Sequence, residues 1–196
     1  MLILKCSALI LLTICCLSFS WGSAVLFARP EGATKGFSLN FLLDSVLMII
    51  QFIAIIKAEN SNLIIGVIGL NIYIISLALF WWAVKTTKDK PLSLCYSQDL
   101  PSYIITTGPY KLIRNPFYTS YLLPMLAGVL VTDQLWLLIT LVVMLIPLYK
   151  AACQEEAKFS DSSFAAEYKA YKERTGMFLP NLFSFSTPTA SSSIEN

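Results

Sequence analysis

Five apolar runs dominate this chain and leave it few ways to fold. Hydrophobic residues make up 56% of the sequence and charged residues 13%. A helix of about 20 apolar residues crosses the hydrocarbon core of a bilayer, and a helix satisfies its own backbone hydrogen bonds there. The sequence therefore predicts an all-α integral membrane protein with about five transmembrane helices. The runs are residues 2–27, 41–56, 63–84, 118–131 and 135–149.

The last two runs are shorter than the others. Helices confined to them would be only about 21 Å long, which is less than the hydrocarbon thickness of roughly 30 Å. They either recruit flanking polar residues or form a short hairpin that stops before the far face, and we expect the short hairpin. Gln51 and Asn71 lie inside the earlier apolar runs. Because polar side chains are costly in lipid, both are expected to face the protein interior.

The basic residues predict the orientation in the membrane. With the amino terminus outside, every Lys and Arg except Lys5 and Lys57 falls on the cytoplasmic side, as the positive-inside rule favours. The first run also fits a cleaved signal peptide ending near residues 22–24, but cleavage would move the basic residues of segment 85–114 outside, so we prefer a transmembrane helix. The net charge of +2 is too small to indicate a nucleic-acid partner.

Two polar clusters interrupt the apolar sequence. The first, residues 107–118, reads Thr-Gly-Pro-Tyr-Lys-Leu-Ile-Arg-Asn-Pro-Phe-Tyr and contains two Gly or Pro turn signals. The second begins with Glu155 and Glu156 and continues to Tyr168, Tyr171 and Arg174. The apolar runs between the clusters predict that a helical hairpin brings the clusters together on the cytoplasmic side, as two halves of one site.

These motifs, over residues 103–182, resemble the isoprenylcysteine carboxyl methyltransferase family and its phospholipid methyltransferase relatives. The resemblance implies an integral membrane methyltransferase that uses S-adenosylmethionine and faces the cytoplasm. Two positions depart from the family pattern, with Asn115 in place of His and Ser120 in place of Gly. Asn forms hydrogen bonds but does not titrate near neutral pH, so a hydrogen-bonding role survives at position 115 and a proton-shuttling role does not.

The chemistry of S-adenosylmethionine suggests a role for each polar residue. Glu155 and Glu156 can accept hydrogen bonds from its ammonium or ribose, and Arg114 can bind its carboxylate through a bidentate fork. Tyr110 or Tyr118 can stack on its adenine or sulfonium. The predicted cofactor-binding residues are Gly108, Tyr110, Arg114, Asn115, Pro116, Tyr118, Glu155 and Glu156.

Catalysis is expected to come mostly from positioning. Glu156 is the candidate base if the acceptor must lose a proton, and Arg174 is a candidate for orienting an acceptor carboxylate. The chain has no His, and its cysteines lack the spacing of a metal site, so no metal is predicted.

The sequence divides into three parts. Residues 1–84 are predicted to be a three-helix anchor, residues 85–183 the catalytic region, and residues 184–196 a disordered tail. The expected acceptor is amphipathic or lipid-tailed, with a carboxylate or an amine, and it reaches the site from the bilayer. Two alternatives remain open: an NADPH-dependent membrane reductase of the sterol or steroid type, and a non-catalytic membrane adaptor of the same fold. The oligomeric state is not predicted.

Overall fold

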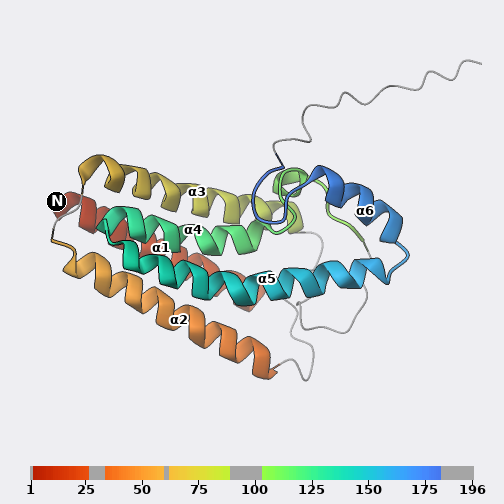
Figure 1. Cartoon of the computed structure of the whole chain (residues 1–196), viewed down its shortest axis with the longest axis horizontal. Helices are drawn as coiled ribbons and strands as arrows, with labels where there is room; N and C mark the ends of the chain where they lie inside the picture. Colours follow the sequence, from red (N-terminus) through yellow and green to blue (C-terminus); the bar gives the residue numbers. More distant parts are fainter. Residues whose placement is uncertain (1, 27–33, 60–61, 89–102, 182–196) are drawn as a thin grey trace, which may run out of the picture.

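The computed structural model describes residues 2–26, 34–59, 62–88 and 103–181, and these are helical almost throughout (Figure 1). Within these ranges there is no β-strand, only an isolated parallel bridge between Ile113 and Gly176. The α-helices are α1 (Leu2–Val25), α2 (Thr34–Lys57), α3 (Leu63–Thr87), α4 (Pro116–Thr132), α5 (Leu138–Ser160) and α6 (Ala165–Arg174), and the 3₁₀ turns are η1 (Gly108–Lys111) and η2 (Leu135–Leu137). The predicted all-helical class is confirmed for the described part of the chain.

Helix α4 lies at the centre of the bundle. It packs against α1, α2, α3 and α5, whereas α6 lies beyond the end of the bundle, beside the last turns of α5 (Figure 1). The side chains of Leu122 and Met125 on α4 belong to the main apolar core, together with Tyr73 on α3 and Met144 on α5. The chain therefore holds the two polar clusters at one end of a packed helical scaffold.

Local signals explain where several helices begin and end. The side chain of Asn62 caps α3 by accepting hydrogen bonds from the amides of Ile64 and Ile65, at 3.0 and 3.3 Å. Helix α4 begins at Pro116, where proline's missing amide hydrogen costs nothing. It ends at Thr132 and is followed by Asp133, whose φ of 56° is the left-handed conformation that commonly stops a helix.

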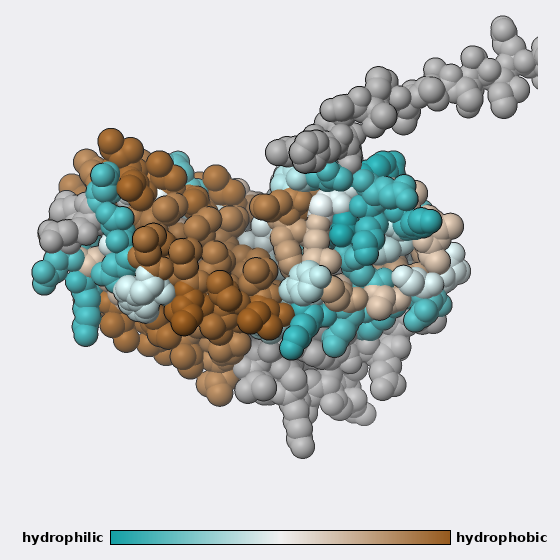
Figure 2. Space-filling model, in the orientation of Figure 1, coloured by the Kyte–Doolittle hydropathy of each residue, from teal (hydrophilic) through white to brown (hydrophobic). Residues whose placement is uncertain are grey.

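Three helical segments are long and apolar enough to cross a membrane: 2–25, 63–87 and 135–160, within the residues described. Figure 2 shows hydrophobic residues over the bundle on the face that it draws, with hydrophilic residues gathered over α6. Helix α4 is short, at 17 residues, as predicted. The prediction of a second short helix is wrong: α5 has 23 residues, because its helix continues past the apolar run into the polar residues that contain Glu155 and Glu156.

The polar residues within the apolar runs differ in how deeply their side chains are buried. Gln51 is fully buried, and its amide nitrogen donates to the hydroxyl of Thr140 at 2.8 Å, as expected for an interior position. For Asn71 the prediction is wrong, because its side chain is exposed. The Asn71 amide instead donates to the carbonyl of Val67, one turn earlier, at 2.8 Å, which satisfies one polar group without an interior partner. The predicted tail, residues 184–196, lies outside the described residues.

Candidate active site

The first polar cluster begins with a tight turn against the end of α3. Gly108 has a φ of 59°, a conformation that favours glycine. A Cβ at this position would lie 2.2 Å from the hydroxyl oxygen of Thr86 on α3. The predicted Gly108-Pro109 turn is therefore confirmed as the 3₁₀ turn η1, and glycine allows that turn to lie directly on α3.

The chain after α6 lies alongside the first cluster. The backbone amide of Arg114 donates to the carbonyl of Gly176 at 2.8 Å, and the amide of Asn115 donates to the carbonyl of Met177 at 3.1 Å. The hydroxyl of Thr119 donates to the carbonyl of Phe178 at 2.9 Å. We call residues 175–178 the docked segment. It joins the end of α6 to the turn that precedes α4.

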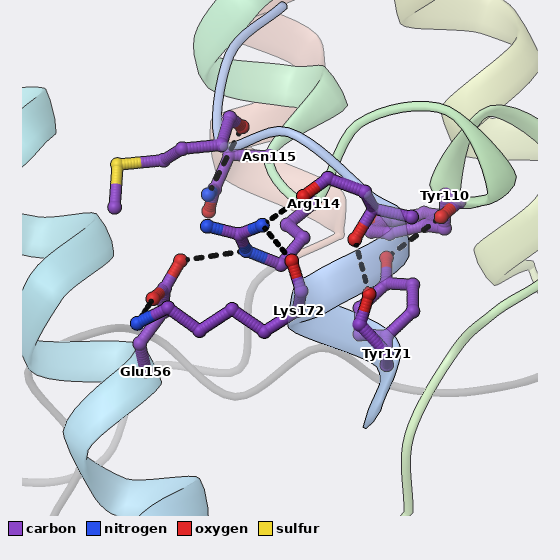
Figure 3. A network of polar contacts seen from close by, with 8 residues as sticks. Tyr110, Arg114, Asn115, Glu156, Tyr171 and Lys172 are labelled. Atoms are coloured by element: carbon purple, nitrogen blue, oxygen red, sulfur yellow. Dashed lines mark hydrogen bonds and ion pairs between the residues drawn. The ribbon is translucent and has the colours of Figure 1, made fainter. Parts of the chain in front are cut away.

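Arg114 and Glu156 form an ion pair between the two clusters. The Nε of Arg114 lies 2.8 Å from Oε1 of Glu156, and both side chains are buried, with exposures of 8% and 7% (Figure 3). Nη1 of Arg114 also donates to the carbonyls of Lys172, at 3.2 Å, and Thr175. The predicted contact between the two clusters is confirmed, and Arg114 extends it to the backbone of the docked segment.

The second oxygen of Glu156 has a different partner. Oε2 lies 2.6 Å from Nζ of Lys172, whose side chain is 54% exposed (Figure 3). One carboxylate thus accepts from a buried guanidinium on one side and from a half-exposed ammonium on the other. Lys172 did not figure in the sequence prediction, because a Lys near the end of a polar helix usually carries only a surface charge.

Glu155 points elsewhere and contacts Tyr118. The Tyr118 hydroxyl donates to Oε1 of Glu155 at 2.7 Å. Adjacent helical residues point about 100° apart, which explains why neighbouring glutamates on α5 contact different residues of the first cluster. Both glutamates therefore link α5 to the start of α4, one through Arg114 and the other through Tyr118.

Aromatic residues support the ion pair from α6. Tyr168 stacks on Phe159 of α5 with ring centroids 4.2 Å apart. The Tyr171 hydroxyl donates to the carbonyl of Tyr110 at 2.7 Å (Figure 3). Burial raises the pKa of Tyr171 to about 12, and burial together with the nearby Glu155 raises that of Tyr110. These hydroxyls keep their protons at neutral pH, so Tyr171 remains a hydrogen-bond donor.

The remaining candidate residues differ in position. The side-chain amide of Asn115 donates to the carbonyl of Met177 at 3.3 Å (Figure 3), and Pro116 begins α4 next to it. Arg174 is exposed, and its Nε donates to the carbonyl of Ala170 on the same helix at 3.2 Å. The structure thus brings Arg114 and Asn115 to the docked segment and Glu156 to Arg114, while Arg174 remains on the outer surface.

Sequence reasoning missed the partners that come from the docked segment. Thr175 and Met177 accept hydrogen bonds through backbone carbonyls, and a carbonyl is present at every residue, so no side-chain pattern identifies them. Gly176 carried a weak signal. A Cβ there would lie 1.7 Å from the carbonyl oxygen of Leu179, so the close packing of this segment requires glycine.

These features define an all-helical protein with apolar, membrane-length helices and a charged polar site at one end of the bundle. In the described part of the chain, no group of three or more His, Cys, Asp or Glu could hold a metal ion. Residues 64–167, more than half of the 196-residue chain, match the phospholipid methyltransferase family. The chain belongs to this family, which confirms the resemblance drawn from the two motifs and implies a methyltransferase.

One curated protein is similar over a shorter stretch. It is the cobalt-zinc-cadmium resistance protein CzcN of Cupriavidus metallidurans, with 34% identity over 79 residues. The alignment covers 40% of this chain and 36% of CzcN, so the chain spans little more than a third of that relative. No solved structure matches the chain.

Proposed function

We propose that this protein transfers a methyl group from S-adenosylmethionine to a lipid-like or prenylated acceptor, a carboxylate or an amine, at the cytoplasmic face of the membrane. Membership of the phospholipid methyltransferase family supports the reaction class. The apolar helices support a membrane-bound acceptor. The contact of Arg114 with Glu156, made between segments 42 residues apart in sequence, is the observation that carries the site assignment.

The donor set fits S-adenosylmethionine. When bound, S-adenosylmethionine supplies an electrophilic methyl group and presents an ammonium, a carboxylate and a ribose diol to the protein. Glu156 offers a carboxylate that accepts from cations on both of its oxygens, and so suits the ammonium. The ring of Tyr118, fixed through its hydroxyl to Glu155, offers an aromatic face for adenine or the sulfonium.

Arg114 has a positioning task in this proposal. Its Nε and Nη1 are engaged by Glu156 and by carbonyls at the end of α6. Nη2 is the one guanidinium nitrogen of Arg114 without a hydrogen bond to the described residues, so a single nitrogen is left for a carboxylate in place of the Nε and Nη pair of a bidentate fork. We therefore assign to Arg114 chiefly the orientation of Glu156 and of the docked segment, with Asn115 holding the same segment through Met177.

The position of the site at the membrane favours an acceptor with an apolar tail. We propose five membrane crossings, formed by α1 to α5, with residues 85–183 carrying the chemistry and α1 to α3 serving as the anchor. Exposed lysines at the site end of the bundle, Lys85, Lys88 and Lys111, favour the cytoplasmic side for that end. An acceptor with an apolar tail can then approach from the membrane, while the methyl donor arrives from water.

Ligand binding tests the proposal directly. Isothermal titration of the detergent-purified chain with S-adenosylhomocysteine and with NADPH distinguishes the methyltransferase, which binds the first, from a reductase, which binds the second. A non-catalytic adaptor binds neither. Glu156→Gln should weaken S-adenosylhomocysteine binding about 10- to 100-fold, since a hydrogen bond to a charged group contributes about 1.5–3 kcal/mol.

A matched control separates this effect from a general loss of charge. Glu167→Gln changes an exposed glutamate at the start of α6 and should leave binding within about twofold of the parent, as surface substitutions usually do. Thermal unfolding of each variant checks that the fold is retained. The site assignment is wrong if folded Glu156→Gln binds like the parent.

The acceptor can be found by transfer of label. Membranes with and without the protein would be supplied with S-adenosylmethionine labelled on its methyl group and then separated into lipid and protein fractions. We expect protein-dependent label in an apolar product. Label confined to water-soluble products would contradict a lipid-tailed acceptor.

A further inference from the structure

The two cations that contact Glu156 differ in how easily they can leave. Arg114 is buried and also donates to two backbone carbonyls, so its departure would remove the donor of the buried Glu156 carboxylate and of both carbonyls. Lys172 is 54% exposed, and within the described residues its ammonium has Glu156 as its only ion-pair partner. Lys172 can therefore move into water and be solvated, whereas Arg114 cannot.

The backbone of Lys172 does not need to move when its side chain leaves. The carbonyl of Lys172 accepts a hydrogen bond from Nη1 of Arg114, and Thr175 accepts another from the same atom. Tyr171, the preceding residue, is anchored to Tyr110. The end of α6 is thus held by contacts that do not involve the lysine ammonium, and only a flexible side chain is rearranged.

We propose that Lys172 is a placeholder cation: its ammonium occupies the position on Oε2 of Glu156 that the ammonium of the methyl donor takes, and it swings into solvent when the donor binds. This inference rests on the proposed function. Lys172 then limits the affinity of the site, because a ligand must displace it. It also favours ligands with a cation of their own, since the vacated carboxylate oxygen needs a positive partner.

The direction in which a substitution of Lys172 changes the affinity for the ligand distinguishes this role from the other two that Lys172 can have. If Lys172 is a competitor, Lys172→Met frees Oε2 and strengthens binding. If Lys172 binds the ligand's carboxylate, or if it is needed to hold α6, the same substitution weakens binding. An ion pair with an exposed partner contributes about 0.2–1 kcal/mol. Because the Glu156 side of this pair is buried, the upper part of that range applies, and a gain of about two- to fivefold in affinity is expected.

The experiment compares two ligands in isothermal titrations of the full chain. S-Adenosylhomocysteine carries the amino-acid ammonium, whereas 5′-methylthioadenosine lacks the amino-acid group. Lys172→Met and Lys172→Gln should each bind S-adenosylhomocysteine about two- to fivefold more tightly than the parent. Binding of 5′-methylthioadenosine should stay within about twofold, because that ligand does not compete for Oε2.

Lys169→Met is the matched control. Lys169 is exposed one turn earlier on α6 and makes no ion pair within the described residues, so its substitution should change neither affinity. Unchanged or weaker S-adenosylhomocysteine binding by the Lys172 variants overturns the placeholder role, and so does an equal gain for both ligands. A parent protein that does not bind S-adenosylhomocysteine at all would instead overturn the proposed function.

Discussion

Asn115 shows what the polar position before α4 requires from its side chain. Its amide donates to the carbonyl of Met177, a contact that needs a donor and no titration. We predict that Asn115→His keeps a donor and retains most of the stability. Asn115→Asp should destabilise the fold by about 1 kcal/mol, because a carboxylate oxygen then replaces the side-chain donor and faces the carbonyl of Met177, which keeps only the backbone amide of residue 115. Thermal unfolding of the two variants checks this, and equal stability would show that the contact is dispensable.

The hydroxyl of Tyr171 supplies a second contact whose contribution should depend on pH. Tyr171→Phe leaves the carbonyl of Tyr110 without this donor and should lower the free energy of unfolding by about 1 kcal/mol. The folded-state pKa of about 12 lies above the ordinary value of 10.0. Folding therefore favours the protonated hydroxyl. The contribution of this hydroxyl to the free energy of unfolding is complete below pH 10 and is lost as the pH rises towards 12.

Comparing the parent with Tyr171→Phe across that range isolates this hydroxyl from the other tyrosines. The difference in unfolding free energy should be constant from pH 7 to 9 and then shrink. A difference that grows with pH would contradict the assigned direction of the pKa shift.

At the scale of elements, the docked segment depends on glycine at position 176. A Cβ there would meet the backbone oxygen of Leu179, and backbone cannot move aside as a side-chain tip can. Gly176→Ala should therefore destabilise the fold by about 1–3 kcal/mol and speed amide hydrogen exchange in residues 171–178. Gly66→Ala is the control, since its Cβ would meet only the flexible side chain of Leu4. Equal exchange in the two variants would argue against a rigid docked segment.

The sequence predicted elements better than their contacts. Apolar runs located α1, α3 and α4, and Pro116 marked the start of α4 because proline is favoured at that position. The length of α5 was missed, since hydropathy marks where lipid contact ends and not where a helix ends. Its polar extension contains Ala, Gln, Glu and Lys, which are good helix formers, and that signal was available.

For the site, the sequence predicted that the two polar clusters meet but not which side chains pair. Arg114 and Glu156 were both assigned to the cofactor, whereas in the structure they form an ion pair with each other. The additional contact of Glu156 with Lys172 was not predictable, because it depends on how α6 turns back against α5. Arg174 and Lys172 look equivalent in the sequence, and only their positions around the helix decide that Lys172 contacts Glu156 while Arg174 contacts the backbone of its own helix.

At the scale of the whole molecule, the face drawn in Figure 2 has an apolar surface between two ends that carry hydrophilic residues. The connection between α2 and α3 lies at one end, and α6 lies at the other (Figure 1). If α6 faces the cytoplasm, a cysteine placed at Glu167 on α6 should react with a membrane-impermeant maleimide in inverted vesicles only. A cysteine placed at Glu59, after α2, should react only in right-side-out vesicles. Both positions are exposed, so burial does not limit the reaction.

The natural cysteines require a control, because Cys6 is exposed and Cys153 is partly exposed. The parent chain, labelled in parallel, provides their background, and mass spectrometry of the labelled peptides assigns each site separately. Positive residues near the site end favour the cytoplasmic side for that end, so the cysteine on α6 should be labelled from the cytoplasmic side. Labelling of both positions from one side would contradict three crossings between them by α3, α4 and α5. The reversed pattern would put the ion pair on the outer face, away from a cytoplasmic supply of methyl donor, and would contradict the proposed reaction.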